Sequence, residues 1–311
     1  MKLATTTADF ARFTASNTER IRHLYDAGFR HIDLSLYDDF VGKSPFFAPD
    51  WRAYTKGLAD FAAGLGMTFV QAHSPGGNPL DDDSVKDLLA STVRSVEVCG
   101  LLGIPNTVVH AGVKRGIGKK EYFERNLAFY RQLFPVMEET GVRVLIENST
   151  HANMGENYYF YTGADMREFV EYAAHPLLGV CWDTGHANIE GSQYKEICAL
   201  GDTLKAIHFN DNRGERDEHI LPYAGTLSVD EVMQALIDSR FSGIFTFECD
   251  SSLRPSKYWL GNRRQMKDAR PGKLTSENRL SEPPLALAKK IEEALYLCGK
   301  YILEGYGCWE E

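Results

Sequence analysis

Side chains that can ligate a metal or transfer a proton are concentrated between residues 180 and 224. Carboxylates and imidazoles are common protein ligands of divalent metals, and they are also the usual general acids and bases near neutral pH. A solvated surface loop has no need for so many of them in one stretch. The stretch therefore predicts a site that binds a metal or moves protons. Its candidate residues are Asp183, His186, His208, Asp211, Asp217 and His219.

The candidates begin where short apolar runs end. Residues 178–182 precede Asp183, and residues 204–207 precede His208. Such runs, bounded by glycine or polar residues, are typical of buried β-strands. Because a closed barrel of parallel strands brings their carboxyl ends to one mouth, the side chains at these ends are expected to converge. The same arrangement recurs in four more runs, which end at His73, His110, Glu147 and Glu248.

Eight alternations of strand and helix predict the architecture. Repeated βα units with right-handed crossovers form parallel sheets, and no break in composition divides the chain. We therefore expect an α/β fold, a single (β/α)8 TIM barrel over residues 1–311 with its active site at the C-terminal ends of the strands. The expected strands are 2–6, 31–36, 67–73, 106–112, 142–148, 178–183, 204–209 and 243–248. The expected helices are 19–29, 51–66, 82–103, 121–141, 166–175, 194–200, 228–239 and 284–304.

Three further segments have predicted roles around the barrel mouth. Tyr37, Phe46 and Phe47 could wall a pocket or pack against the rim, and Asp50 is a credible N-cap for the next helix. The segment 149–166 is long and rich in glycine and asparagine, which is typical of a functional lid. Residues 251–283 are polar, basic and interrupted by proline. We expect them to form an extension over the mouth or a subunit contact.

Charge and cysteine content restrict the class of protein. The net charge of −9, from 34 basic and 43 acidic residues, argues against a broad surface for nucleic acid or anionic lipid. The six cysteines show no CxxC spacing, so we expect reduced, buried thiols. No apolar stretch is long enough for a signal peptide or a membrane span. We expect a cytoplasmic protein without nucleic-acid or membrane partners, and leave open whether it forms a homo-oligomer.

Four strand-end residues form the strongest candidate metal site. Glu147, Asp183, His208 and Glu248 end the fifth to eighth strands and give a mixed oxygen and nitrogen set. One divalent ion is expected, Mn²⁺ first, with Mg²⁺, Co²⁺ or Zn²⁺ also compatible. The ion would hold neighbouring sugar oxygens and stabilise an enediolate, while one carboxylate removes a proton and another returns it. Any single strand-end carboxylate or histidine could be structural, but four independent ends favour a metal site.

The remaining polar residues have two interpretations each. They could be further ligands, or they could bind substrate hydroxyls and orient the ligands. Arg213 and Arg216 could clamp a hydroxyl, carboxylate or phosphate, or could be solvated loop charges. The residues left open between ligand and substrate contact are His73, His110, His186, Asp217 and His219.

The strand-end motifs carry a family resemblance over nearly the whole chain to about residue 250. The motifs IEN, CWDTGH, HFND, DEH and FE resemble those of the xylose isomerase-like TIM-barrel superfamily, in its sugar phosphate isomerase/epimerase branch. Ketose 3-epimerases and inosose-type enzymes are relatives in that branch. The resemblance implies a divalent-metal-dependent sugar or sugar phosphate isomerase/epimerase with a small-molecule substrate. It is specific to the superfamily and not to one sugar.

The resemblance also implies roles for individual residues. Glu147 and Glu248 would act as the acid/base pair as well as metal ligands. The implied ligands of the main metal are Glu147, Asp183, His208 and Glu248, and the implied substrate contacts are His186 and Arg213. From their residue types we also expect His73, His110 and His219 to contact substrate, with Asp217 and His219 as candidates for additional metal binding.

Other functions stay open at this point. Endonuclease IV-type apurinic-site nucleases of the same superfamily bind three zinc ions through nine ligands, and this sequence offers a candidate for each. However, the segment SPGGNPL after His73 lacks the bulky wedge that such a nuclease would insert into a duplex. A dehydratase or lyase on keto-sugars or glycosides would share the metal and the base. A non-catalytic sugar-binding barrel is the remaining alternative. The nine candidates for three zinc ions are His73, His110, Glu147, Asp183, His186, His208, Asp217, His219 and Glu248.

Overall fold

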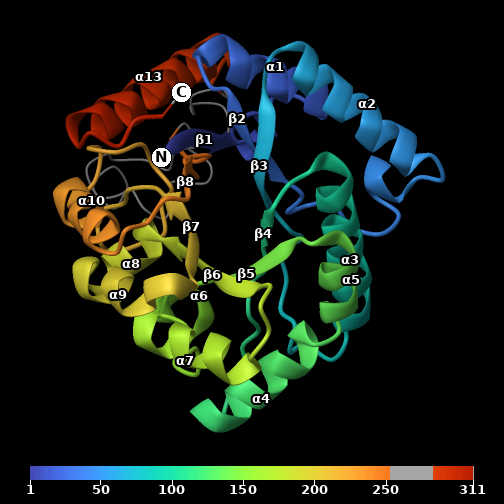
Figure 1. Ribbon diagram of the computed structural model, residues 1–311, viewed down its shortest axis with the longest axis vertical. Helices are drawn as coiled ribbons and strands as arrows, with labels where there is room; N and C mark the ends of the chain where they lie inside the picture. Colours follow the sequence, from blue (N-terminus) through green and yellow to red (C-terminus); the bar gives the residue numbers. More distant parts are fainter. Residues whose placement is uncertain (253–282, 311) are drawn as a thin grey trace, which may run out of the picture.

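Eight parallel strands close into a barrel in the computed structural model, which describes residues 1–252 and 283–310 (Figure 1). Each strand pairs in parallel with its sequence neighbours, and β1 pairs with β8 to close the sheet. The predicted single TIM barrel is therefore confirmed. The strands are β1 (Lys2–Thr6), β2 (His31–Ser35), β3 (Thr68–His73), β4 (Asn106–Val108), β5 (Arg143–Glu147), β6 (Leu178–Asp183), β7 (Leu204–Phe209) and β8 (Ile244–Phe247).

Helices surround the barrel and connect successive strands (Figure 1). Short 3-10 turns are η1 (Thr7–Phe10), η2 (Pro45–Phe47) and η3 (Gly201–Thr203). The α-helices of the first half are α1 (Asn17–Ala27), α2 (Trp51–Gly64), α3 (Val85–Leu102), α4 (Lys119–Tyr130) and α5 (Phe134–Thr140). Those of the second half are α6 (His151–Met154), α7 (Gly163–Ala173), α8 (Thr184–Glu190), α9 (Tyr194–Leu200), α10 (Val229–Asp238) and α13 (Leu285–Gly305).

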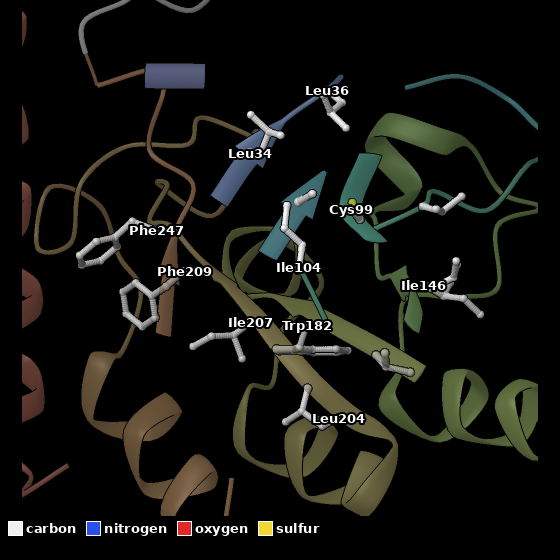
Figure 2. Close-up of a cluster of buried hydrophobic side chains, with 14 of the residues drawn as sticks. Leu34, Leu36, Cys99, Ile104, Ile146, Trp182, Leu204, Ile207, Phe209 and Phe247 are labelled. Carbon is white, nitrogen blue, oxygen red and sulfur yellow. The ribbon is translucent and has the colours of Figure 1, made fainter. Parts of the chain in front are cut away.

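The strands bury side chains on both faces, and this alternation positions the site. Outward-facing residues such as Trp182, Ile207 and Phe247 belong to the layer between sheet and helices (Figure 2). A separate small cluster of Val108, Leu145, Cys181 and Ala206 fills the barrel interior. Because side chains two positions apart share one face of a strand, the next inward residues are the predicted ligands. The inward pairs are Leu145 with Glu147, Cys181 with Asp183, and Ala206 with His208.

The C-terminal helix α13 completes the outer layer beside α1 (Figure 1). Gly299 permits its close approach to the sheet, since a Cβ there would lie 2.6 Å from the side chains of both Leu3 and Phe247. The helix was predicted within a residue of its observed bounds. The predicted extension at 251–283 lies outside the described residues, apart from Ser251, Ser252 and Pro283.

Several predicted helix bounds were wrong. The helix predicted at 121–141 is two helices, α4 and α5, with Pro135 in the first turn of the second, where its missing N–H costs nothing. The helix predicted from residue 166 begins three residues earlier, because Thr162 caps it through the Asp165 N–H. Helix α8 was not predicted at all. By contrast, Gly28 ends α1 as expected, with a positive φ of 119°.

Two smaller predictions were correct only in part. Asp50 occupies the N-cap position of α2 but makes no side-chain capping bond. All six cysteines are unpaired, as expected, but only Cys99, Cys181 and Cys249 are buried. Among residues 1–252 and 283–310, no helix is both long and apolar enough to cross a membrane.

Candidate metal centre

The strand ends bring the predicted ligands together in three clusters. Within each cluster one donor atom from every residue lies within 4.8 Å of the others. We call them the central, His73 and His186 clusters. The central cluster is Glu147, Asp183, His208 and Glu248; the His73 cluster is His73, His110 and Glu147; the His186 cluster is His186, Asp217 and His219. The convergence expected from the sequence is therefore present in the fold.

Glu147, at the end of β5, belongs to two clusters because its two oxygens face different partners. Its Oε1 lies 2.5 Å from Nδ1 of His208, and its Oε2 lies 2.8 Å from Nε2 of His110. Burial by itself would raise the pKa of this carboxyl, but the imidazoles of His208, His110 and His73 hold the pKa well below its usual range. The side chain is only 2% exposed. Glu147 is therefore an ionised, dehydrated carboxylate that links the central and His73 clusters.

His208 lies near a third carboxylate, Asp33, for which the sequence predicted no role. Its Nδ1 faces Glu147 and Glu248, while its Nε2 lies 3.5 Å from Oδ2 of Asp33 on β2. Gln71 on β3 donates from Nε2 to the same Asp33 oxygen at 2.9 Å. At 3.5 Å this contact between His208 and Asp33 is longer than a hydrogen bond, so Asp33 acts on His208 through its charge. Asp33 is inconspicuous in the sequence because it lies within an apolar strand rather than at its end.

Asp183 is held by asparagines that directly follow two ligand strands. Asn210 donates from Nδ2 to Oδ2 of Asp183 at 2.6 Å, and Asn148 donates to the Asp183 carbonyl oxygen at 2.9 Å. The other carboxylate oxygen accepts the His186 N–H at 2.6 Å, so Asp183 is also the N-cap of α8. Burial raises the pKa of Asp183 to about 6, against the opposing effect of the His186 and His219 imidazoles.

Helix α8 passes so close to Asn210, the residue after β7, that a side chain at the second residue of the helix would have to displace this asparagine. A Cβ on Gly185 would lie 1.8 Å from Oδ1 of Asn210. The capped turn that begins at Asp183 then places His186 one turn along, facing the cavity. The three-residue spacing between Asp183 and His186 in WDTGH therefore follows from helix capping as well as from the chemistry of the two side chains. This dual role of Asp183 explains why α8 was not predicted.

The His186 cluster is built from α8 and the loop after β7. Nε2 of His186 lies 3.1 Å from Oδ2 of Asp217, and Nε2 of His219 lies 2.9 Å from Oδ1. Asn153, on α6, donates to Asp217 at 2.9 Å. His219 has a φ of 47°, a conformation unusual for a non-glycine residue and enriched at functional sites. Its Nδ1 lies 3.1 Å from the Glu248 carbonyl oxygen, which ties this cluster to the end of β8.

The His73 cluster lies beneath an aromatic wall. Nδ1 of His73 is 2.8 Å from the Ser74 carbonyl, which makes Nδ1 the protonated donor and turns Nε2 towards Glu147. The Tyr37 ring packs edge-on against His73 and His110, with centroid distances of 5.3 and 6.0 Å. It is 45% exposed and lines the cavity. Of the two interpretations given for the aromatic loop, Tyr37 fits the pocket wall.

The donor chemistry of these clusters fits divalent cations. The four carboxylates pair with imidazoles, and no lysine or arginine pairs with any of them among the described residues. Buried carboxylates need compensating positive charge, which only protonated histidines or a bound cation can provide here. Despite burial, Cys181, Glu248 and Glu147 raise the pKa of His208 well above its usual range. Asp217 and Glu248 do the same for His219, and Asp183 and Asp217 raise the pKa of His186 to about 10. The carboxylates in question are Glu147, Asp183, Asp217 and Glu248.

The clusters form the floor of a cavity of about 940 Å³. Asp183 and His208 lie fully buried beneath it. Arg213 does not line this cavity; it is 60% exposed and pairs with Glu218. Asp211 is buried and accepts backbone N–H bonds from Gly225 and Leu227, so it organises the loop after β7. The predicted site residues that line the cavity are His73, His110, Glu147, His186, Asp217, His219 and Glu248.

The rest of the lining comes from residues that the sequence did not single out. Ser149, Asn153, Met154 and Tyr158 come from the segment predicted as a lid. Of the other predicted wall residues, Phe46 is buried and Phe47 packs against the core, so both fit the rim interpretation. The first two βα loops and the start of α1 contribute a further group: Ala8, Ala11, Arg12, Ala15, Asn17, Arg20, Asp38, Asp39, Lys43 and Pro45.

The arrangement of ligands at the barrel mouth agrees with a comparison of the sequence with protein families. A family model described as xylose isomerase-like TIM barrel matches residues 21–269. The chain belongs to this family. The superfamily resemblance seen in the strand-end motifs is thereby confirmed.

Curated members similar to this xylose isomerase-like barrel include uncharacterised and nuclease-named proteins. The uncharacterised protein y4fM of Sinorhizobium fredii is 27% identical over 264 residues, which cover 74% of this chain and 81% of that protein. A probable endonuclease 4 of Citrifermentans bemidjiense is 30% identical over 177 residues, which cover 50% of this chain and 61% of that protein. The match to the nuclease is therefore partial on both sides.

Solved structures similar to the barrel include sugar epimerases. D-psicose 3-epimerase of Clostridium cellulolyticum, with D-tagatose, superposes with a TM-score of 0.72 at 20% identity, covering 97% of this chain and 99% of that chain. The IolI protein with a zinc atom bound superposes with a TM-score of 0.71 at 17% identity, covering 98% and 99%. At these identities the likeness establishes a shared fold.

Proposed function

We propose that the protein is a divalent-metal-dependent sugar isomerase or epimerase that works by proton transfer at a carbon next to a carbonyl. The observation that carries the proposal is the central cluster, in which Glu147 and Glu248 flank one ligand set at the floor of the cavity. A bound divalent ion would supply Lewis-acid stabilisation of negative charge on the substrate oxygens. The sugar epimerases that share the fold support this choice.

Glu248 is the better placed of the two proposed acid/base residues. It lines the cavity with its side chain 20% exposed, whereas both oxygens of Glu147 face histidines. Although burial opposes ionisation, His208 and His219 lower the pKa of Glu248 to about 2, so it is a carboxylate at neutral pH. Glu248 would remove the substrate proton. Glu147, which is ionised at rest, would return a proton that it takes from the imidazole of His110 or His208. His186 and His110 would contact substrate hydroxyls.

Solvent deuterium uptake by a panel of ketoses, their phosphates and keto-glycosides tests this function in the Mn²⁺-loaded protein. We expect exchange at one carbon, and net isomerisation or epimerisation of one panel member. Glu248→Gln should abolish exchange while the fold is retained, and the surface change Glu139→Gln is the matched control. Retained turnover by Glu248→Gln would remove its role as the base. Loss of water or of an aglycone, instead of exchange, would identify a dehydratase or lyase.

A second candidate, an apurinic-site endonuclease with three zinc ions, is favoured by one specific observation. All nine candidate ligands fall into three clusters in this fold, and probable endonucleases 4 are among the curated relatives. The loop after β3 argues against the nuclease function. Its Ser74 is buried and forms hydrogen bonds with Ser95 and Thr107, and the Gly76 backbone packs against the Tyr37 ring. No large exposed side chain remains at residues 74–80 to enter a duplex.

The two candidates are separated by one substrate and one analysis. A duplex with a single abasic site, incubated with the zinc-loaded protein, should stay intact if the sugar function holds. Efficient incision would replace the sugar function by the nuclease. Elemental analysis after removal of loosely bound metal gives an independent reading, with three zinc ions per chain favouring the nuclease and one ion favouring the sugar enzyme.

A further inference from the structure

The cavity is much larger than the metal clusters require. Its volume of about 940 Å³ is near the top of the range of roughly 300–1,000 Å³ that buries a drug-sized ligand, whereas a single sugar ring is several-fold smaller. The metal clusters occupy only its inner end. The outer end is lined by the first two βα loops, at residues 7–17 and 36–50, together with Arg20 of α1 and Asp250 after β8.

We propose that this outer end is a second sugar subsite, so that the preferred substrate is a disaccharide or other glycoside whose reacting ring lies at the central cluster. The proposal rests on the proposed sugar function and specifies its substrate class. The two ends meet at Tyr37, whose ring packs against His73 and His110, while the neighbouring Asp38 lines the outer end. An aromatic ring at this junction is suited to lie between two linked rings.

The charges of the outer end favour a neutral polyhydroxyl group over an anion. Among the described residues that line the outer end, three cationic side chains are balanced by three carboxylates, so their formal charges sum to zero. A phosphate subsite needs excess positive charge, whereas a sugar hydroxyl both donates and accepts and is matched by donors and acceptors side by side. The cationic residues are Arg12, Arg20 and Lys43, and the carboxylates are Asp38, Asp39 and Asp250.

Part of this end is already built and oriented by contacts within the protein. Asn17, in the first turn of α1, is only 6% exposed and donates from Nδ2 to the Tyr54 hydroxyl at 3.2 Å. Arg20, one turn further along, donates from Nε to the Thr14 carbonyl at 2.9 Å, which fixes its guanidinium plane. Asp39 lies close enough to Arg20 for its charge to raise the pKa of Arg20 against the effect of burial. A planar amide, a guanidinium and a carboxylate therefore line one wall.

Matched pairs of sugars test the proposal in the Mn²⁺-loaded full chain. Titration calorimetry would compare the affinities for D-fructose, D-fructose 6-phosphate and the glucosyl-fructose maltulose. The rate of solvent deuterium exchange would be measured separately for each sugar. We expect maltulose to bind at least about 10-fold more tightly than D-fructose, since one charge-assisted hydrogen bond provides a factor of this size. The phosphate should bring no comparable gain.

Two variants test whether the gain in maltulose affinity comes from the outer end of the cavity. Arg20→Lys keeps the charge but loses the forked donor, and Asp39→Asn loses a charged acceptor. Each variant should bring the ratio of maltulose affinity to fructose affinity close to one, without changing the affinity for fructose. Arg125→Ala, on the exposed face of α4, is the control and should leave the ratio unchanged. Thermal melting verifies that each variant is folded.

The outcomes separate the subsite from the function. Binding of fructose without a preference for maltulose, or a preference that survives in both variants, overturns the subsite while the sugar function stands. Stronger binding of the phosphate than of maltulose also overturns it, and identifies an anion site. Absence of binding and exchange with every sugar overturns the proposed function and the subsite with it.

Discussion

A buried pair of carboxyl groups behind β1 gives the clearest quantitative test of the structure. Glu292, on α13, is 3% exposed, and it adjoins Asp9 of η1, whose Oδ2 accepts a hydrogen bond from Thr5 at 2.8 Å. Burial raises the pKa of Glu292 to about 8, and burial together with Glu292 raises that of Asp9 well above its usual range. Cys249 and Asp250 are the other titratable groups facing this pair. No lysine or arginine pairs with Glu292 among the described residues.

The sign and size of the effect follow from linkage. In the unfolded chain Glu292 ionises near its ordinary pKa of about 4.3, so unfolding releases a proton at neutral pH. Stability from this group is therefore complete below pH 4 and is lost as the pH rises towards 8. Each unit of pKa difference corresponds to about 1.4 kcal/mol, so the loss between pH 5 and pH 8 is about 3 kcal/mol. Glu292→Gln removes the ionisation and should remove this loss.

Urea unfolding of the wild type and Glu292→Gln at pH 5 and pH 8 measures the effect, with the metal content held constant. We expect the variant to gain about 3 kcal/mol over the wild type on going from pH 5 to pH 8. Glu293→Gln, which removes an exposed partner of Lys290 on the same helix, should show little pH-dependent change. A difference between Glu292→Gln and wild type that is the same at both pH values would refute the assignment of a raised pKa to this pair.

Three further predictions concern the metal centre. Adding Mn²⁺ to the chelator-treated protein at about 100 times its Kd should stabilise it by about 2.7 kcal/mol and restore exchange; an unchanged melting temperature would exclude binding by the folded state. Asn210→Ala should weaken metal affinity by about 10–100-fold, measured by metal titration, because it removes the 2.6 Å bond to Asp183. Gly185→Ala should destabilise the fold by about 1–3 kcal/mol, because the new methyl overlaps Asn210, whereas Gly64→Ala, with no atom within 4 Å, should not. Equal stabilities of the two glycine variants would contradict the close approach of α8 to β7.

The barrel and the convergence of ligands could be predicted from the sequence because both follow from a strong local signal. A buried strand gives a continuous apolar run, and a charged residue at its end stands out against that run, as Glu147 does after VRVLI. The clustering of these ends then follows from the closed parallel sheet alone. For this reason the fold and the central cluster needed no information about distant contacts.

The contacts that orient the ligands could not be predicted in the same way. Asp33 points into the barrel from a mid-strand position, and only the closure of the sheet brings it near His208. Asn148 and Asn210 were visible in the motifs IEN and HFND, but their role as clamps on Asp183 depends on the register between β5, β6 and β7. The position of Arg213 could not be predicted either, because its pairing with Glu218 depends on the conformation of the loop after β7.

The proposed function would place chemistry and recognition in different parts of the barrel. All nine candidate ligands come from β3 to β8 and the segments that follow them, whereas β1, β2 and their loops supply none. Those two loops and the start of α1 instead line the outer end of the cavity, with Asn17, Arg20 and Asp39 among the lining residues. Because Glu147 belongs to two clusters, a change at the ligands would disturb both at once. Changes in the first two loops can alter what the cavity accepts without touching a ligand, so these loops are where members of this fold with the same ligands would differ in substrate.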